Sequence, residues 1–195
     1  MINNIAIFAS GAGSNAKKII AYFNLNLEKN IRVSVIVSNK KTAGVLDIAR
    51  ENNIPIIILD KENFYNPNHP TFNIQHSTFN IDYIVLAGFL WKIPAHLIQQ
   101  FPDKIINIHP ALLPKFGGKG MFGMNVHRAV IAVGELETGI TIHFVNEKYD
   151  EGKIIFQKSF EIEKNDTAEI IQHKIQQLEH HYFPLIIEDL VKNKL

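Results

Sequence analysis

Short apolar runs alternate with stretches of helical periodicity along the first half of the chain. The runs are rich in Ile and Val and nearly continuous, and they cover residues 5–8, 31–37, 54–59, 83–87 and 104–108. Runs of this kind are typical of strands that are covered on both faces. The helix-like stretches between them cover residues 15–23, 42–52 and 94–101. This alternation predicts βαβ units and a mainly parallel sheet.

The pattern changes near residue 136. Residues 139–145 and 152–160 predict two strands joined by a polar turn. In the first strand, Thr141 and His143 should share one face, because side chains alternate along a strand. We expect this pair to extend the sheet, with at least one strand antiparallel.

A long helix is predicted at the C-terminal end. It should begin near Asp166, because Asp166 and Glu169 have the spacing of a capping box. Pro184 should kink or end this helix. Its expected apolar stripe consists of Ile171, Ile175, Leu178, Tyr182 and Leu185. The whole pattern predicts a single α/β domain over residues 1–195, with a Rossmann-like, mainly parallel twisted sheet and helices on both faces.

Two segments are expected to be loops. Residues 60–80 are rich in Asn, although Phe72, His76 and Phe79 have helical spacing and indicate a short helix there. Residues 115–123 contain four glycines, which favour mobility or close backbone approach. The conformation of either segment does not follow from the sequence.

Composition narrows the class of protein. The chain has 195 residues, 46% of them hydrophobic and 20% charged, which is ordinary for one globular domain. The net charge of +1 gives no reason to expect nucleic acid or membrane as a partner. The absence of Cys excludes disulfides, thiolate nucleophiles and Cys-ligated zinc. No signal peptide and no apolar run of roughly 18 residues is found, so we expect a cytoplasmic protein.

The first predicted strand leads into a glycine-containing loop at residues 10–16. Gly11, Gly13 and Ala16 match the dinucleotide fingerprint, but the ribose-binding acid about 20 residues later is missing. Glycines and the amides of a following helix attract an anion, and Ser14 and Asn15 add donors. We therefore expect a phosphomonoester here. The alternative is a structural βα turn with an N-capping Ser.

Asn107 and His109 lie two positions apart at the end of a predicted strand and should therefore share a face. The carboxyl ends of parallel strands are where open α/β folds bind ligands. A side-chain amide can donate to a developing oxyanion, and an imidazole can transfer a proton. The pair is therefore suited to acyl transfer to an amine. The spacing is equally compatible with a hydrogen-bonded structural histidine.

Asp150, in the turn between the two late strands, is the candidate partner of His109. A carboxylate beside an imidazole raises the pKa of the imidazole. The alternative is an ordinary turn aspartate, and the 41 positions that separate the two residues leave their contact open. His143 either lines the same cleft or packs beside it. Residues 87–91 either form a floor for a flat heterocycle or pack in the core.

The last helix offers weaker candidates. His180 and His181 are adjacent and do not share a helix face, which argues against a metal site. Glu179 is by default a solvated charge.

Four blocks of the sequence together resemble a known family. They are Ser10 to Asn15, Leu86 to Phe89, Asn107 to Pro114, and Gly139 to Val145 with Asp150. In this order and spacing they resemble phosphoribosylglycinamide formyltransferases, the folate-dependent enzymes of purine synthesis. Asn-x-His-Pro with the distant Asp marks the wider formyltransferase family, and Ser-Gly-x-Gly-Ser-Asn narrows the resemblance to this branch. The resemblance covers almost the whole chain.

The resemblance implies roles for individual residues. Asn107 would stabilise the tetrahedral intermediate, His109 would transfer the proton, and Asp150 would raise the pKa of His109 and order a water. The substrate phosphate and ribonucleotide would be bound by Gly13, Ser14, Asn15, Gln176 and Glu179. The folate would be bordered by Leu90, Trp91, Lys92, Ile93, Asn107, Val145, Asn146, Glu147, Lys148 and Tyr149.

The resemblance also implies the ligands and assembly. The substrates would be 10-formyltetrahydrofolate, as the co-substrate, and glycinamide ribonucleotide, without a metal. The protein would be a monomer or a homodimer. Some positions depart from the family. Trp91 stands where some relatives have Arg, and the 60s loop has Lys61 and no Arg, so Lys119 is a candidate substitute for an anion contact.

The sequence also bears on other functions. A methionyl-tRNA formyltransferase would need an RNA-binding C-terminal domain and an Arg-Gly-Ala stretch, where this chain has residues 116–120. A formyltetrahydrofolate hydrolase would bring an N-terminal regulatory domain. A formyltransferase acting on an amino sugar nucleotide stays open, because that acceptor is also an amine. The missing ribose acid disfavours a dinucleotide-dependent oxidoreductase, and the joint presence of Asn107, His109 and Asp150 argues against a silent binding module.

Overall fold

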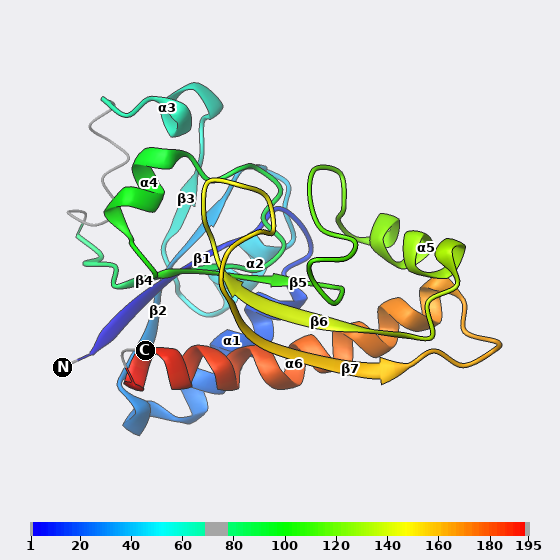
Figure 1. Cartoon of the computed structure of the whole chain (residues 1–195). Coiled ribbons are helices and arrows are strands. Elements are labelled where there is room, and N and C mark those ends of the chain that lie inside the picture. The colour runs from blue at the N-terminus through cyan, green and yellow to red at the C-terminus, as the bar shows by residue number, and fades with distance from the viewer. Residues whose placement is uncertain (1, 69–77, 194–195) are drawn as a thin grey trace.

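A seven-stranded sheet forms the centre of the molecule (Figure 1). The computed structural model describes residues 2–68 and 78–193. The strands are β1 (Asn3–Phe8), β2 (Ile31–Ser38), β3 (Ile56–Ile58), β4 (Tyr83–Leu86), β5 (Ile105–His109), β6 (Glu137–Phe144) and β7 (Ile154–Glu161). Their order is β3-β2-β1-β4-β5-β6-β7, with the first five parallel and β6 and β7 antiparallel to their neighbours. The predicted fold class is confirmed.

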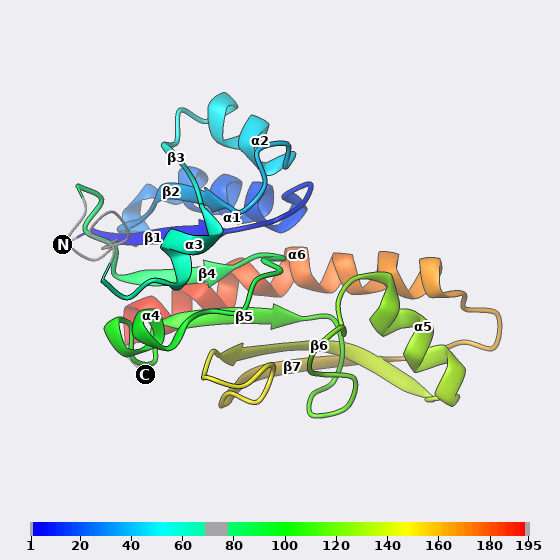
Figure 2. The ribbon, with the colours of Figure 1, turned by 90° about the horizontal axis from the view of Figure 1, so that it is seen from above.

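Helices cover both faces of this sheet (Figures 1 and 2). They are α1 (Ser14–Leu25), the 3-10 helix η1 (Leu27–Lys29), α2 (Val45–Glu51), α3 (Lys61–Tyr65), α4 (Ala95–Gln100), α5 (Met124–Val133) and α6 (Ala168–Asn193). Side chains of α1, α2 and α6 share one hydrophobic cluster, and those of α3 and α4 share the other. No helix within the described ranges combines the length and apolarity needed to cross a membrane.

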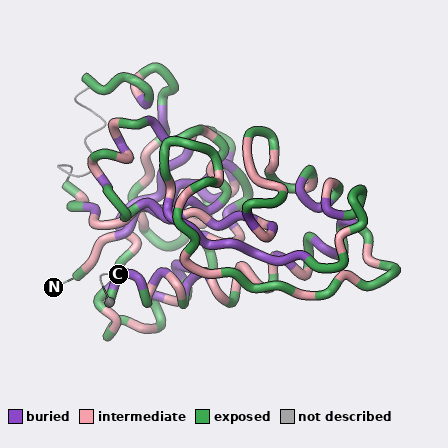
Figure 3. The backbone as a smooth tube through the Cα atoms, in the orientation of Figure 1, coloured by how far each residue is buried: buried purple, intermediate pink, exposed green. Residues whose placement is uncertain are grey.

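The parallel strands are buried on both faces, which explains their continuous apolar runs. In β1, Ile5 and Ile7 belong to one cluster, whereas Ala6 and Phe8 belong to the other. Figure 3 shows the buried residues concentrated along the central strands, with exposed residues along the loops. Burial on both faces removes the need for polar alternating positions.

The start of α6 differs from the prediction. Thr167, not Asp166, caps it, because the Thr167 hydroxyl accepts a hydrogen bond from the Ile170 N–H at 3.3 Å. The Asp166 carboxylate instead accepts from the Glu163 N–H at 2.9 Å and forms an ion pair with Lys174 at 2.8 Å. Asp166 therefore closes the turn before the helix, and the predicted capping box was wrong.

The second half of α6 also differs. The helix continues through Pro184 to Asn193, so Pro184 does not end it. Phe183 and Ile187 beside the proline are fully buried, and their packing offsets the lost backbone hydrogen bond. Leu185 is 39% exposed, so its place in the predicted apolar stripe was wrong.

Helix α5 was not predicted. It is a short helix with Gly123 and Gly134 at its ends, and its buried positions are Val126, His127 and Val130. Helix α3 begins after Asp60, whose side chain accepts from the Asn63 N–H at 3.1 Å. The helix indicated by the spacing of Phe72, His76 and Phe79 falls largely outside the described residues.

Candidate active site

Asn107 and His109 lie at the carboxyl end of β5 and line one cavity of about 710 Å³. The Asn107 side chain is half-buried, whereas His109 is 3% exposed. The cavity is also bordered by the loop after β1, the loop after β4, residues 118–123, α5 and α6. The two side chains therefore share a face, as the strand periodicity predicts.

The hydrogen bonds of His109 define which ring nitrogen carries the proton. Its Nε2 lies 2.8 Å from the Phe116 carbonyl oxygen, which can only accept, so Nε2–H is the donor. Its Nδ1 faces the Asp150 carboxylate at 3.7 Å. In the neutral imidazole, Nδ1 is therefore the nitrogen that is free to take up a proton.

Two opposing effects set the pKa of His109. Burial lowers it below its ordinary value, because an imidazolium is poorly solvated there. The Asp150 carboxylate and the Phe116 carbonyl raise it, but less than burial lowers it. Asp150 thus acts in the expected direction, while the net shift is downward. His109 is consequently neutral at neutral pH.

The Asp150 carboxylate lies between two histidines. Its Oδ2 accepts from the Gly118 N–H at 2.9 Å, and its Oδ1 lies 3.7 Å from His143 Nε2. Burial alone would raise the pKa of Asp150, but His143, His109 and the Gly118 N–H together hold it below its ordinary value. The carboxylate is therefore ionised, and Asp150 contacts His109 across the 41 positions that separate them.

His143 holds the Asn107 amide. Its Nδ1 lies 2.8 Å from the Phe144 carbonyl oxygen, so in the neutral imidazole Nδ1–H donates and Nε2 is left as an acceptor. The Asn107 Nδ2 group lies 3.0 Å from this Nε2 and donates to it. His143 is 2% exposed and fixes the orientation of the amide, leaving the second Nδ2 hydrogen of Asn107 for another acceptor.

The loop after β1 forms another end of the cavity. Gly13 has a φ of 80°, and a Cβ added there would lie 2.7 Å from Val45 Cβ, so only glycine is accommodated. Gly13 is also the N-cap residue of α1, and no side chain caps this helix. The alternative of an N-capping Ser is therefore excluded. Ser14 instead accepts a hydrogen bond from the Gln176 amide at 3.2 Å.

Glu179 is joined to this loop. Asn15 Nδ2 donates to Glu179 Oε2 at 2.8 Å, and both residues line the cavity. Burial raises the pKa of Glu179 to about 7, and the Asn15 hydrogen bond opposes this rise. The default prediction of a solvated charge was wrong, because packing of α6 against α1 encloses the carboxyl group.

The residues predicted to border a folate are distributed unevenly. Leu90, Asn107 and Tyr149 line the cavity. Trp91 packs against Phe64, with ring centroids 5.8 Å apart. The remaining six residues do not line the cavity. Ile93 is 4% exposed, Val145 is half-buried, and Glu147 is exposed. The Lys92 ammonium lies 5.7 Å from the centre of the Tyr149 ring, and the Asn146 and Lys148 side chains hydrogen-bond to Glu151.

Several residues that line the cavity were not predicted as site residues, and Lys40 and His127 are the ones with titratable side chains. Lys40 follows β2 and lines the cavity together with the loop after β1. His127, on the unpredicted helix α5, is 2% exposed and lies on the cavity wall. The sequence signal for Lys40 was its place where a dinucleotide fold has its ribose acid. Within the described ranges, no group of His, Asp and Glu side chains could hold a metal ion.

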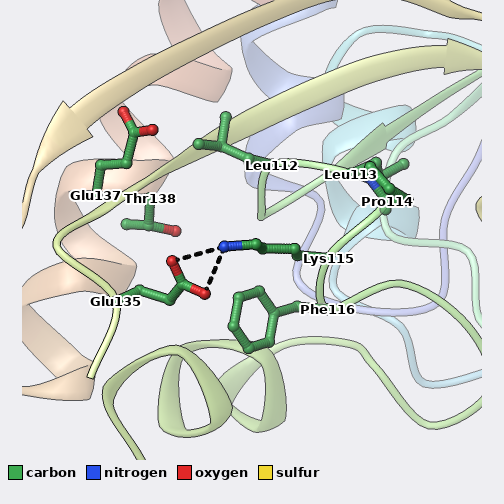
Figure 4. A pocket seen from close by; sticks show the side chains of 8 residues that line it. All are labelled: Leu112, Leu113, Pro114, Lys115, Phe116, Glu135, Glu137 and Thr138. Carbon is green, nitrogen blue, oxygen red and sulfur yellow. Dashed lines mark hydrogen bonds and ion pairs between the residues drawn. The ribbon is translucent and has the colours of Figure 1, made fainter. Parts of the chain in front are cut away.

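A smaller cavity of about 210 Å³ lies beside the start of the 115–123 loop (Figure 4). Figure 4 shows the Lys115 ammonium between both carboxylate oxygens of Glu135, at 2.9 and 3.0 Å. Phe116 also lines this smaller cavity, while its carbonyl accepts from His109. The loop therefore has an anchored beginning, at Lys115, and a glycine-rich remainder that borders the large cavity.

Comparison with known proteins identifies relatives of the whole chain. Residues 3–187 match the family described as Formyl transferase. The chain is 37% identical to the chloroplastic phosphoribosylglycinamide formyltransferase of Arabidopsis thaliana, covering 98% of this chain and 66% of the relative. It is 36% identical to the phosphoribosylglycinamide formyltransferase of Bacillus subtilis, covering 97% and 95%. The chain thus spans about two thirds of the length of the plant relative.

Solved structures agree with the sequence relatives. The crystal structure of phosphoribosylglycinamide formyltransferase from Bacillus halodurans superimposes with a TM-score of 0.86 and 32% identity, covering 99% of this chain and 97% of that one. That of glycinamide ribonucleotide transformylase 1 from Geobacillus kaustophilus gives a TM-score of 0.86 and 30% identity, covering 97% and 99%. The likeness therefore extends over nearly all of both chains.

Proposed function

The chain belongs to the formyl transferase family, and from this premise we propose that it transfers a formyl group from 10-formyltetrahydrofolate to the amine of 5'-phosphoribosylglycinamide. The products are formylglycinamide ribonucleotide and tetrahydrofolate, in purine synthesis towards IMP. The observation that supports the chemistry is the meeting of Asn107, His109 and Asp150 at one cavity. The relatives named phosphoribosylglycinamide formyltransferase support the choice of acceptor.

The first step is attack of the neutral amine on the formyl carbon, which places negative charge on the formyl oxygen. The Asn107 amide is a suitable donor to this oxyanion, since His143 takes one Nδ2 hydrogen and leaves the other. A donor whose orientation is fixed before the reaction stabilises the transition state without reorganisation. We assign the oxyanion role to Asn107.

The second step moves a proton from the attacking amine to N10 of the leaving folate. We assign this transfer to His109 Nδ1, because Nε2 is already a donor to the Phe116 carbonyl. The imidazolium that forms is stabilised by the Asp150 carboxylate at 3.7 Å. The proton then passes to N10 as the C–N bond breaks, and His109 returns to its neutral form.

Substrate positions follow from the cavity walls. We place the phosphate at Gly13, Ser14 and Asn15, where glycine and the start of α1 favour an anion. Gln176 and Glu179 would then contact the ribose and glycinamide. The folate would lie between residues 90–93 and residues 145–150. We further propose that residues 1–195 act as one domain, as a monomer or homodimer in the cytoplasm.

The direct test measures release of tetrahydrofolate when the protein is mixed with 10-formyltetrahydrofolate and glycinamide ribonucleotide. We expect turnover that depends on both substrates. Turnover with an amino sugar nucleotide, and none with glycinamide ribonucleotide, would overturn the acceptor. Thermal unfolding supplies a second test: a rise in Tm with NAD but none with folate would favour an oxidoreductase instead.

A further inference from the structure

His127 is a buried imidazole on the wall of the large cavity, and the proposed reaction does not use it. It is 2% exposed, and no residue in the described part of the chain hydrogen-bonds its Nδ1. A buried N–H without a partner is rarer and more costly than a buried lone pair, so the proton belongs on Nε2. His127 lines the cavity, and with the proton on Nε2 its N–H donor is the ring nitrogen that is not among the enclosed, unpartnered atoms.

The same wall presents further donors. Lys119 lines the cavity and forms no ion pair with any described residue. The backbone N–H groups of Gly120 and Gly123 lack hydrogen-bond partners within the described ranges. Gly123 precedes α5, a helix of 10 residues whose amino end carries partial positive charge. A cation, an imidazole N–H and free amides therefore gather on one wall.

The acidic groups of the cavity leave this wall available to an anion. The Asp150 carboxylate accepts from Gly118 and faces His109 and His143. The Glu179 carboxyl accepts from Asn15, beside the loop after β1. Both acids are thus engaged by other partners. The cavity of about 710 Å³ also exceeds what one small anion at the first loop would fill.

We propose that Lys119, His127 and the free amides of Gly120 and Gly123 form a second oxyanion subsite, separate from the one at Ser10 to Asn15. The two subsites use different elements, the start of α5 and the start of α1. The oxyanion has two possible sources. One is a glutamate carboxylate of the folate donor, which rests on the proposed function. The other is a free ion such as inorganic phosphate.

An occupant of this subsite would also contact the loop that positions the proton-transfer pair. The Phe116 carbonyl holds His109 at 2.8 Å, and the Gly118 N–H holds Asp150 at 2.9 Å. The Phe116 carbonyl and the Gly118 N–H belong to the same loop as Lys119 and the free amides. Binding an oxyanion would therefore fix the segment that positions the proton-transfer pair.

The test compares Lys119→Met with Lys115→Met, a matched control on the same loop. The Lys115 ammonium pairs with Glu135 at the smaller cavity, so its loss should leave donor binding unchanged (Figure 4). If the source is the donor, Lys119→Met raises the KM for 10-formyltetrahydrofolate about tenfold with little change in kcat, as expected for one lost charge-assisted hydrogen bond. The KM for the pteroate analogue, which lacks the glutamate, stays constant. Lys119→Arg restores the wild-type value.

The free-ion source is tested by phosphorus NMR of inorganic phosphate, with glycinamide ribonucleotide saturating the first subsite. Broadening of the phosphate signal by wild type and Lys115→Met, but not by Lys119→Met, supports this source. His127→Phe should have the same effect as Lys119→Met in whichever of the two experiments, the KM measurement or the phosphate NMR, shows an effect. Its Tm checks that the variant is folded. The subsite is refuted if Lys119→Met and His127→Phe change neither the KM for 10-formyltetrahydrofolate relative to that for the pteroate analogue nor the binding of inorganic phosphate. If the wild-type protein shows no turnover, the proposed function is refuted instead. The phosphate NMR experiment still tests the subsite in that case.

Discussion

Asn15 and Glu179 lie 164 positions apart, and a hydrogen bond of 2.8 Å from Asn15 Nδ2 to Glu179 Oε2 joins the start of α1 to α6. The contact encloses a carboxyl group beside the loop that we assign to the substrate phosphate. Because burial raises its pKa to about 7, this carboxyl changes charge near neutral pH. The ionised form would repel a phosphate, whereas the protonated form would not.

Glu179→Gln should stabilise the protein at pH 8 and have little effect at pH 4.5. The folded-state pKa of about 7 lies above the ordinary 4.5, so the folded state binds the proton more tightly than the unfolded state. The wild type therefore loses stability as pH rises from 4.5 to 7, by at most about 3 kcal/mol, and Gln avoids this loss. Urea unfolding at both pH values measures it. Glu137→Gln, at an exposed carboxylate, is the control, and an equal effect of Glu179→Gln at both pH values would contradict the prediction.

Gly13→Ala should destabilise the protein by about 1–3 kcal/mol and weaken substrate binding. Alanine is strained at a φ of 80°, and its Cβ would lie 2.7 Å from Val45. Gly11→Ala is the control, because no atom lies within 4 Å of a Cβ added there. Thermal unfolding and the KM for glycinamide ribonucleotide are the measurements. If Gly13→Ala matches Gly11→Ala in both, the tight turn is not required.

His109→Ala should lower kcat by about 10²–10⁴-fold while both substrates still bind, since it removes the proton carrier. The pH profile of the wild type provides an independent check. Burial lowers the pKa of His109, so the neutral form persists into mildly acidic solution, and kcat should fall only at more acidic pH. A variant with near-normal turnover would exclude His109 from the proton transfer.

Asp150→Asn should lower kcat and move the acidic limb of the pH profile to lower pH. The Asp150 carboxylate raises the pKa of His109, so its loss lets burial lower that pKa further. Glu151→Gln is the matched control, because this neighbouring carboxylate pairs with Lys148 on the surface. Movement of the limb to higher pH would show that Asp150 acts through some other group.

The fold was largely predictable because its signals are local. Continuous apolar runs identify strands buried on both faces, and the alternating pattern after residue 136 identifies the antiparallel pair. Helix α5 was missed because it is only 10 residues long and follows directly on the glycine-rich stretch 115–123, so that the helical spacing of Val126 and Val130 is a short signal. The end of α6 was misjudged because tertiary packing around Pro184 outweighs a local rule.

The site was predictable only where neighbours in sequence suffice. Asn107 and His109 share a face through strand geometry alone. The environment of Glu179 depends on a contact between α1 and α6, and that of Asp150 on a turn that brings it beside His109. Burial of His109, which outweighs the Asp150 charge in setting its pKa, has no sequence signal at all.

His143 is predicted to act by positioning Asn107. His143→Phe should keep the ring packing but remove the acceptor for Asn107 Nδ2, so kcat should fall about 10-fold to 100-fold with KM nearly unchanged. A double-mutant cycle separates this role from a general structural one. In the Asn107→Ala background, His143→Phe should cause little further loss, because the amide that it orients is already absent. Additive losses in the double variant would mean that His143 acts independently of Asn107, most directly through the Asp150 carboxylate at 3.7 Å.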